Sequence, residues 1–405
     1  MFDHLQIYDR RERWAVGLAD VALRALAAPA RLRRLPPAGA APQRVLVLRL
    51  ERIGDLLMTF QALSVLRASL PSARIDLVVG NWNEPLAHAM AVADRVDPLD
   101  APWLARDQPG ASSARLLSHA RGWRAHKYDL AINFEPDIRS NLLLWMSGAP
   151  RRVGYSTGGG GATLTDTAAY DPTLHTHDNA VRLVALAAPD ANPASLPHPR
   201  LQLPGAARER AGRLLAPAAG SSCIGLHASG GRPVKQWHTR RFAELATALS
   251  LEYGATIVLT GTSHDAGTVR EVQAAVPAPV RVLNLSGQAD VLDLAAVIER
   301  LAVFISADTG PMHLAAAVGT PLVALFGPSD PARYAPRTSG SRIVRIDLPC
   351  SPCNRIRLPP ERCRGHVPDC LDGITVDDVL AAVRESLFLD PGRGLRGVSP
   401  AVRLA

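Results

Sequence analysis

The sequence predicts an α/β protein with two doubly wound parallel sheets. Short apolar runs alternate along the chain with stretches in which apolar residues recur at helical spacing, a pattern typical of strands buried on both faces. This alternation occurs twice, and residues 154–204, which are rich in Gly, Pro, Asp and His, separate the two blocks. In a chain of 405 residues, two such blocks indicate two domains with one sheet each.

The apolar runs place the strands. In the first block they predict strands at residues 45–48, 75–79 and 129–134. A helix is expected from Asp55 to Leu70, where Pro71 follows. The strands expected in the second block lie at residues 223–227, 255–259, 282–285, 303–306 and 322–326, with a helix at residues 242–251.

Four segments follow from this pattern. We expect an N-terminal segment at residues 1–42, a first domain at residues 43–205, a second at residues 206–390 and a tail at residues 391–405. Because open parallel sheets bind ligands at the carboxyl ends of their strands, the strand ends of the two domains are expected to line a shared cleft.

The N-terminal segment ends in a Pro- and Gly-containing stretch, residues 35–42, that is typical of a linker. Before it, apolar residues recur at helical spacing: Trp14, Leu18, Val21 and Ala25. Arg clusters flank this stretch, so an amphipathic helix lying on an anionic membrane surface is one interpretation. The pattern is imperfect, because Val16 and Leu23 fall on the side of Asp20. A helix packed on the folded body and a poorly ordered terminus remain the alternatives.

Composition narrows the class of protein. The chain is 47% hydrophobic and 20% charged, with 45 basic and 37 acidic side chains and a net charge of +8. This balance favours anionic partners without choosing among phosphosugars, nucleotides, nucleic acid and acidic lipids. Neither a signal-peptide pattern nor a membrane-spanning run is evident, so a cytoplasmic protein is expected. No recognised nucleic-acid-binding pattern is present, so nucleic acid is not expected as a partner.

Four groups of polar residues, which we call constellations, each follow a predicted strand. Two of them lie early in their blocks. In the first, Gly54 lets the chain approach a ligand closely and Asp55 falls at a helix N-terminus, although Asp55 could be no more than an N-cap. In the second, a loop of small residues from Ser229 leads to Lys235. Bare backbone N–H groups and an ammonium suit a diphosphate, although no P-loop spacing exists and a plain surface turn fits equally well.

The other two constellations lie later in the second block. Asp265 follows a predicted strand and could accept hydrogen bonds from a ribose. Alternatively, a helix begins here and is capped by Ser263 or Asp265. Thr309 and Gly310 place N–H donors at a helix N-terminus, where an anion is favoured. His313 lies about one turn into that helix and could contact a phosphate or be a packed, hydrogen-bonded His.

Taken together, these motifs resemble glycosyltransferase family 9, which includes the ADP-heptose lipopolysaccharide heptosyltransferases. The resemblance runs from about residue 44 to about residue 383. Its elements are Arg-Ile-Gly-Asp at residues 52–55, Asp-Thr-Gly-x-x-His-Leu at residues 308–314 and Gly-Pro-Ser-Asp-Pro at residues 327–331. It implies a GT-B fold of two Rossmann-like domains, with the acceptor on the first and the nucleotide sugar on the second.

The resemblance also implies roles. Asp55 matches the general base of an inverting sugar transfer, and Arg52 and Gly54 fall on the acceptor side. The donor residues that it implies are Ser229, Lys235, Asp265, Asp308, Thr309, Gly310 and His313. The implied partners are a nucleotide sugar, ADP-heptose above all, and a lipopolysaccharide-core or lipid-linked glycan acceptor. That acceptor would lie on the cytoplasmic side of the inner membrane, so peripheral contact with this membrane is a further expectation. No cofactor is required by this chemistry, and Mg²⁺ is left open.

Other readings stay open at this stage. A different GT-B enzyme, such as a transferase with another donor or a sugar-nucleotide epimerase, would keep the same motifs. A non-catalytic nucleotide- or glycan-binding module would not need to keep both Asp55 and Lys235. A late cysteine segment, Cys350, Cys353, Cys363 and Cys370, adds a hypothesis of structural zinc. Its first pair has zinc-site spacing and its second does not, so free thiols or a redox-sensitive pair are the alternatives.

Overall fold

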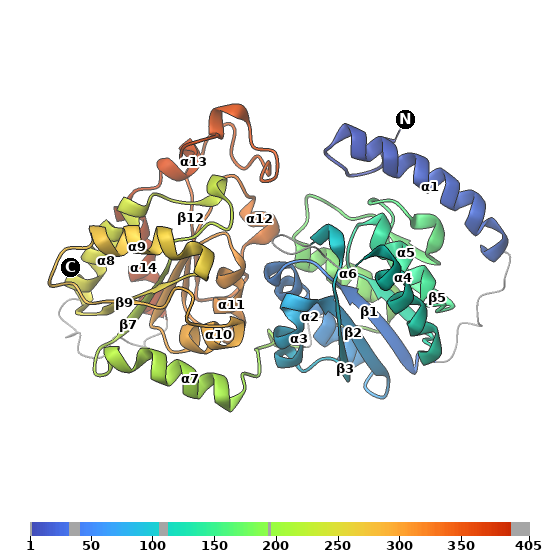
Figure 1. Ribbon diagram of the computed structural model, residues 1–405, viewed down its shortest axis with the longest axis horizontal. Helices are drawn as coiled ribbons and strands as arrows, with labels where there is room; N and C mark the ends of the chain where they lie inside the picture. Colours follow the sequence, from blue (N-terminus) through green and yellow to red (C-terminus); the bar gives the residue numbers. More distant parts are fainter. Residues whose placement is uncertain (1, 32–40, 105–111, 193–195, 390–405) are drawn as a thin grey trace. The chain divides into compact units, whose positions relative to one another are not determined.

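The computed structural model describes residues 2–31, 41–104, 112–192 and 196–389. The chain divides into two compact units, Met1–Pro199 and Arg200–Ala405 (Figure 1). The domain limits predicted from the sequence remain a prediction. Most of the expected linker at residues 35–42 and all of the expected tail fall outside the described residues, and none of the helices within the described residues is long and apolar enough to cross a membrane.

Unit 1 holds a six-stranded parallel sheet in the order β3-β2-β1-β4-β5-β6. Its strands are β1 (Arg44–Arg49), β2 (Arg74–Gly80), β3 (Arg95–Leu99), β4 (Leu130–Asn133), β5 (Arg151–Tyr155) and β6 (Asp166–Ala168). The central strand β1 is buried from Val45 to Arg49 because helices cover both faces of the sheet, and this is why it is a continuous apolar run.

The described part of unit 1 contains six α-helices. They are α1 (Arg10–Arg31), α2 (Ile53–Ser69), α3 (Glu84–Met90), α4 (Ser113–Gly122), α5 (Ile138–Met146) and α6 (Thr176–Ala187), with short 3-10 turns that include η4 (Gly161–Thr163). One core cluster joins Leu46 and Leu48 of β1 to Trp123 and Leu144. The helix α6 contacts α2, and α1 contacts η4.

Unit 2 repeats the design with the order β12-β11-β10-β7-β8-β9, again parallel throughout. Its strands are β7 (Cys223–His227), β8 (Thr256–Thr260), β9 (Val282–Asn284), β10 (Val303–Ala307), β11 (Leu322–Leu325) and β12 (Ser341–Val344). Its helices are α7 (Gly205–Leu215), α8 (Thr239–Tyr253), α9 (Ala266–Ala275), α10 (Val291–Glu299), α11 (Gly310–Val318), α12 (Pro331–Tyr334), α13 (Asp369–Asp372) and α14 (Val376–Leu389), with 3-10 turns that include η7 (Pro233–Lys235) and η8 (Ser263–Asp265). The core contains Trp237 and Phe242, both fully buried.

The strand order reverses once in each sheet. In unit 1 the chain runs from β1 outward to β3 and returns beside β1 as β4, and in unit 2 it runs from β7 to β9 and returns as β10. The two loops that follow such a pair of neighbouring strands leave the sheet toward opposite faces, which opens a crevice at the carboxyl ends of the strands. A ligand site is therefore expected after β1 and β4 in unit 1 and after β7 and β10 in unit 2.

All strands expected from apolar runs are present, but the prediction missed four. These are β3, β5, β6 and β12. The stretch at residues 154–204 is also more ordered than its composition indicates, since it contains β6 and α6. The missed strands lie at or next to a sheet edge, where polar residues such as Asp166 are tolerated and the apolar signal is weak.

Candidate active site

In unit 1 the crevice contains a carboxylate held by a buried cation. Arg49 ends β1, and Asp55 lies in the first turn of α2. The Nη2 atom of Arg49 is 3.5 Å from Oδ1 of Asp55, and its Nε donates to the main-chain oxygen of Asp55 at 3.2 Å. The Arg49 side chain is 4% exposed and that of Asp55 is 28% exposed, so a substrate can reach the acid but not its partner.

The N-cap of α2 is Arg52, and no side chain caps it. Asp55 is therefore not the N-cap, and the alternative that it serves only as an N-cap is wrong. Its carboxylate lies at the positive end of the α2 dipole, next to Arg49. Burial opposes the charge of Arg49, but the carboxylates of Asp55, Glu51 and Glu135 outweigh it and raise the pKa of Arg49.

A second acid, Glu135, fixes the loop between β1 and α2. It follows β4 and is 2% exposed. Its Oε1 accepts hydrogen bonds from the backbone N–H groups of Leu50 and, at 2.8 Å, Glu51, and its Oε2 accepts from Ser140 Oγ at 2.8 Å. Burial raises the pKa of Glu135, and Arg49 acts in the opposite sense. Sequence reasoning did not assign Glu135 a role, because the Leu50 and Glu51 amides that it holds lie about 85 residues away in the chain.

The other two residues assigned to the acceptor lie in the same loop. Arg52 stacks over the ring of Trp82 at 4.9 Å from its centroid and donates from Nη2 to the Leu104 oxygen at 2.5 Å. Gly54 lies in the first turn of α2 and is half-buried. Their placement beside Asp55 is shown, while acceptor binding itself stays a prediction.

In unit 2 the crevice contains the pair Lys235 and Asp308. Lys235 ends η7 in the loop after β7, and Asp308 follows β10. The Lys235 Nζ donates to Asp308 Oδ2 at 2.9 Å, and their side chains are 18% and 13% exposed. Burial opposes the charge of Asp308, but Lys235 and a hydrogen bond from Ser329 outweigh it and lower the pKa of Asp308. The pair therefore joins the two loops that flank the switch point of this sheet.

Local sequence explains how Lys235 reaches this position. At Gly230 an added Cβ would lie 2.6 Å from the backbone of Lys235 and Gln236, so the loop folds back on itself only because residue 230 has no side chain. Trp237, two positions beyond the lysine, is fully buried and donates from Nε1 to the Ile374 oxygen at 3.2 Å. The loop is thereby fixed on both sides of the ammonium group.

The third constellation lies next to this pair. Asp265 Oδ2 accepts hydrogen bonds from Thr262 N at 2.8 Å and Thr262 Oγ1 at 2.6 Å, which completes a capping box at η8. Burial opposes the charge of Asp265, but hydrogen bonds from Ser229 and Thr262 outweigh it and lower the pKa of Asp265. The capping interpretation is thus confirmed, with Thr262 rather than Ser263 as the N-cap. Because Ser229 follows β7 and Asp265 follows β8, their contact also ties these two strands together.

The fourth constellation begins α11. Thr309 is the N-cap and shares a hydrogen bond with Ser306 at 3.0 Å between their Oγ atoms, and Gly310 is the first helical residue. His313 is 7% exposed and close enough to Asp308 to help lower the pKa of that acid. The α11 N-terminus therefore adds a partial positive charge next to Lys235.

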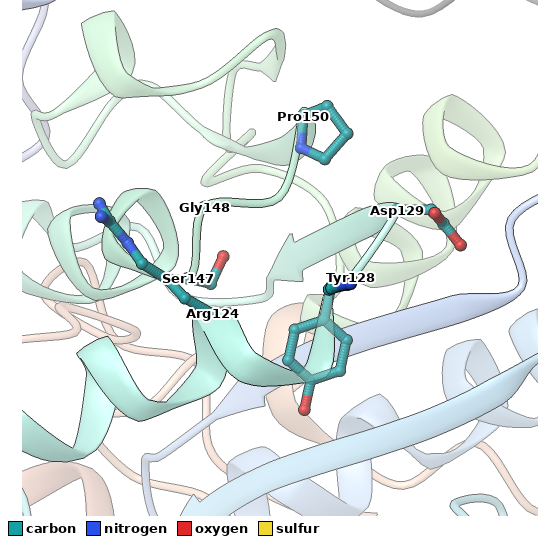
Figure 2. A pocket seen from close by; sticks show the side chains of 7 residues that line it. Arg124, Tyr128, Asp129, Ser147, Gly148 and Pro150 are labelled. Atoms are coloured by element: carbon teal, nitrogen blue, oxygen red, sulfur yellow. The ribbon is translucent and has the colours of Figure 1, made fainter.

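A surface pocket on unit 1 lies at the other edge of the sheet. Arg124, Tyr128, Ser147 and Pro150 are among its lining residues (Figure 2). They precede β4 and β5 along the chain, so they lie at the amino ends of parallel strands. The crevice chemistry described above occurs at the carboxyl ends, and we assign this pocket no part in it.

The cysteine segment does not form a metal site in this structure. Cys350, Cys353 and Cys363 are free and half-buried, and Cys370 is free and buried. Burial, reinforced by the other three cysteines, raises the pKa of the Cys370 thiol to about 11. Across the described residues, no three or more His, Cys, Asp or Glu side chains are arranged to hold a metal ion. The geometry gives the zinc hypothesis no support, and it stays a prediction that elemental analysis of the purified protein tests.

Comparison with known proteins identifies the family. The model of glycosyltransferase family 9 (heptosyltransferase) matches residues 116–361, more than half of the chain. The chain belongs to glycosyltransferase family 9. The match begins after the Asp55 loop, so the assignment of that residue depends on its motif and geometry.

Individual proteins that are similar to this glycosyltransferase are heptosyltransferases or members of family 9. Lipopolysaccharide heptosyltransferase 2 of Escherichia coli K12 is 28% identical over 319 residues, which cover 75% of this chain and 88% of that protein. The structure of E. coli ADP-heptose lipopolysaccharide heptosyltransferase II has a TM-score of 0.71 at 23% identity and covers 86% of this chain and 99% of the other. A family 9 enzyme from Veillonella parvula DSM 2008 has a TM-score of 0.73 at 23% identity, covering 86% and 98%. These matches confirm the predicted GT-B fold and glycosyltransferase class.

The family 9 enzyme should lose stability in mild acid through His227. This residue ends β7, is 5% exposed and contacts Thr260 Oγ1 through Nδ1 at 3.0 Å. Burial lowers the pKa of His227 from 6.5 to about 4, although Asp265 acts in the opposite sense. Between these values the unfolded chain binds the proton and the folded chain does not. The free energy of unfolding therefore keeps its full value above pH 6.5 and decreases by about 3 kcal/mol as the pH falls toward 4.

Urea unfolding between pH 4 and 6.5 tests this expectation. The His227→Asn variant, which keeps a polar atom near the Nδ1 position, should show a flatter dependence of the unfolding free energy on pH than the unaltered protein. The exposed His366 offers a matched control, since His366→Asn should keep the original slope. Equal slopes for all three proteins would mean that His227 does not carry the effect.

Proposed function

We propose that this enzyme transfers a heptosyl residue from ADP-heptose to a lipopolysaccharide-core or similar lipid-linked glycan, with inversion at the anomeric carbon. The E. coli structure of similar fold is that of an ADP-heptose lipopolysaccharide heptosyltransferase, and the E. coli K12 relative is lipopolysaccharide heptosyltransferase 2. The observation that carries the proposal is the grouping of Lys235, Asp308 and the α11 N-terminus at the switch point of unit 2.

Asp55 is the general base in this proposal. An acceptor hydroxyl oxygen attacks the anomeric carbon, its proton passes to a carboxylate oxygen of Asp55, and the bond from that carbon to the diphosphate oxygen breaks. Arg49 and Glu135 are positioning residues, because the first contacts both Asp55 and the Phe134 carbonyl oxygen and the second holds the loop by its amides. Neither needs to contact a substrate to keep the base in place.

Lys235 and the α11 N-terminus stabilise the leaving ADP. Negative charge grows on the diphosphate as the sugar departs, and a preorganised ammonium and amide donors lower the barrier to that step. Asp308 holds the ammonium at 2.9 Å, so the cation needs little reorganisation when the donor arrives. Asp265 and Ser229 lie over the neighbouring strand, where a carboxylate suits the ribose hydroxyls of the nucleotide. These groups supply the charge that the step needs, and chelator treatment tests whether Mg²⁺ contributes.

Thermal unfolding against a panel of nucleotide sugars tests the donor. A donor that binds the folded state alone raises the Tm by mass action, so we expect a shift with ADP-heptose that exceeds the shifts with UDP-, GDP- and CDP-linked sugars. Free ADP should give a smaller shift because it lacks the sugar. A larger shift with a UDP-, GDP- or CDP-linked sugar would replace ADP-heptose as the donor, and no shift with any member would contradict donor binding altogether.

A further inference from the structure

The helix α1 packs on unit 1 through a side that contains Val16, Gly17 and the buried Asp20. Asp20 is 4% exposed, and its Oδ1 accepts a hydrogen bond from the Gly160 backbone N–H at 2.7 Å. Val16 packs so closely on Gly159 that an added Cβ there would lie 2.6 Å from its Cγ1. The ring of Phe2 packs against Gly17 of the same helix. These contacts fix the rotation of α1 about its own axis on unit 1, where Figure 1 shows it in dark blue.

The opposite side of α1 is apolar and exposed. We call it the outer face, and its members are Trp14 (47% exposed), Leu18 (62%), Val21 (54%) and Leu26 (68%). A surface helix ordinarily buries such residues and exposes its acids. In α1 the acid Asp20 is buried while these large apolar side chains stay in water, and such a patch marks an interaction surface.

The charges around the outer face point to an anionic partner. Arg10 and Arg11 are exposed at the N-terminal end of α1, and Arg24 is exposed at its flank. Of the two acids of α1, Asp20 is engaged by Gly160 and by Arg24 at 2.9 Å, and Glu12 is exposed in the first turn. Exposed Arg residues beside a Trp and several aliphatic side chains are the composition of a helix that lies in a lipid interface. The adjoining Tyr8, which is 82% exposed, adds a second amphipathic ring.

We propose that the outer face of α1 docks this enzyme on the surface of an anionic bilayer. The helix would lie in the plane of the headgroups, with Trp14, Leu18 and Val21 inserted and the arginines against lipid phosphates. Lipid binding by this face does not depend on the proposed function. Its consequence for the acceptor, given next, rests on the proposed function. Gly160 lies in the loop after β5, at the carboxyl edge that also holds Asp55. Docking through α1 therefore brings the edge that carries the base to the surface where a lipid-linked acceptor lies.

Sedimentation with vesicles tests the proposal. The full chain should bind vesicles of phosphatidylethanolamine and phosphatidylglycerol, bind phosphatidylcholine vesicles weakly, and dissociate as salt is raised. The double variant Leu18→Asp/Val21→Asp should lower the partition coefficient at least about tenfold, because it removes apolar insertion and adds repulsion. Leu251→Asp, at a leucine of unit 2 that is 72% exposed, is the matched control and should bind as the unaltered protein does. Equal binding by all three proteins, or no binding to anionic vesicles, would overturn the proposal.

Two further readouts keep the interpretation clear. Both substituted side chains are more than half exposed, so the double variant should keep its Tm and its Tm shift with ADP-heptose in the absence of vesicles. Loss of vesicle binding with the donor response intact would support the docking face, whatever the outcome for the acceptor. If the unaltered chain is instead a dimer that the double variant converts to a monomer, and neither binds vesicles, the occupant is a second copy and the lipid proposal is wrong.

Discussion

Replacing Asp55 with Asn should lower the turnover number by about 10²- to 10⁴-fold and leave donor affinity unchanged. The amide keeps the shape of the side chain in the first turn of α2 but cannot take a proton. The residues that we propose to bind the donor, Lys235 and Asp308, lie in the other unit, so ADP-heptose should still raise the Tm. Steady-state transfer and isothermal titration with ADP-heptose measure the two effects separately.

A matched control for this variant exists in unit 2. Asp377 is an exposed acid in the first turn of α14, so Asp377→Asn removes a similar interaction with a helix dipole without touching the crevice. It should retain full turnover. If Asp55→Asn also retained full turnover, Asp55 would not be the base, and if it lost donor affinity and Tm together, its role would be structural.

Replacing Lys235 with Met should reduce both donor affinity and turnover, with a loss of about 10²- to 10³-fold in kcat. The methionine fills much of the same volume without the charge that we propose to contact the diphosphate. It also strands Asp308, which is 13% exposed, as a buried carboxylate without its cation, and such a change costs about 3–5 kcal/mol of stability. Transfer kinetics, donor titration and urea unfolding follow the three quantities.

A double variant separates the two consequences. In Lys235→Met/Asp308→Asn the stranded charge is gone, and the amide can still accept the hydrogen bond that Ser329 gives to residue 308. Stability should recover while donor affinity and turnover stay low. Recovery of activity along with stability would mean that Lys235 supports the fold and not the chemistry.

The central strands could be predicted from sequence because burial on both faces makes them continuous apolar runs. Val45–Leu48 is the clearest case. The strand β6 could not be predicted from sequence, because a half-exposed edge strand that begins with Asp166 has the composition of a loop. Asp55, Lys235 and Asp308 belong to local motifs, and each lies in a segment that follows a strand of its own unit. Glu135 has meaning only through partners far along the chain, which no local pattern encodes.

The sequence also left undetermined which side of α1 faces the protein, because the deciding contact is distant along the chain. Its sequence places apolar residues on both sides, with Val16 and Leu23 next to Asp20, so periodicity could not say which side faces the protein. The hydrogen bond from Gly160 to Asp20 decides this, and that contact spans 140 positions of the chain. The expectation of a helix is confirmed, and of the alternatives for its environment the packed one is correct for its inner side. The outer side carries the membrane proposal.

The most direct test of sugar transfer is the mass of the acceptor. Purified enzyme, ADP-heptose and a truncated lipopolysaccharide core should yield an acceptor heavier by one heptosyl residue, together with an equal amount of ADP, and Asp55→Asn should yield neither at a comparable rate. ADP released with free heptose and an unchanged acceptor, or an acceptor extended equally well by the variant, would contradict the mechanism that we derive from Asp55 and Lys235.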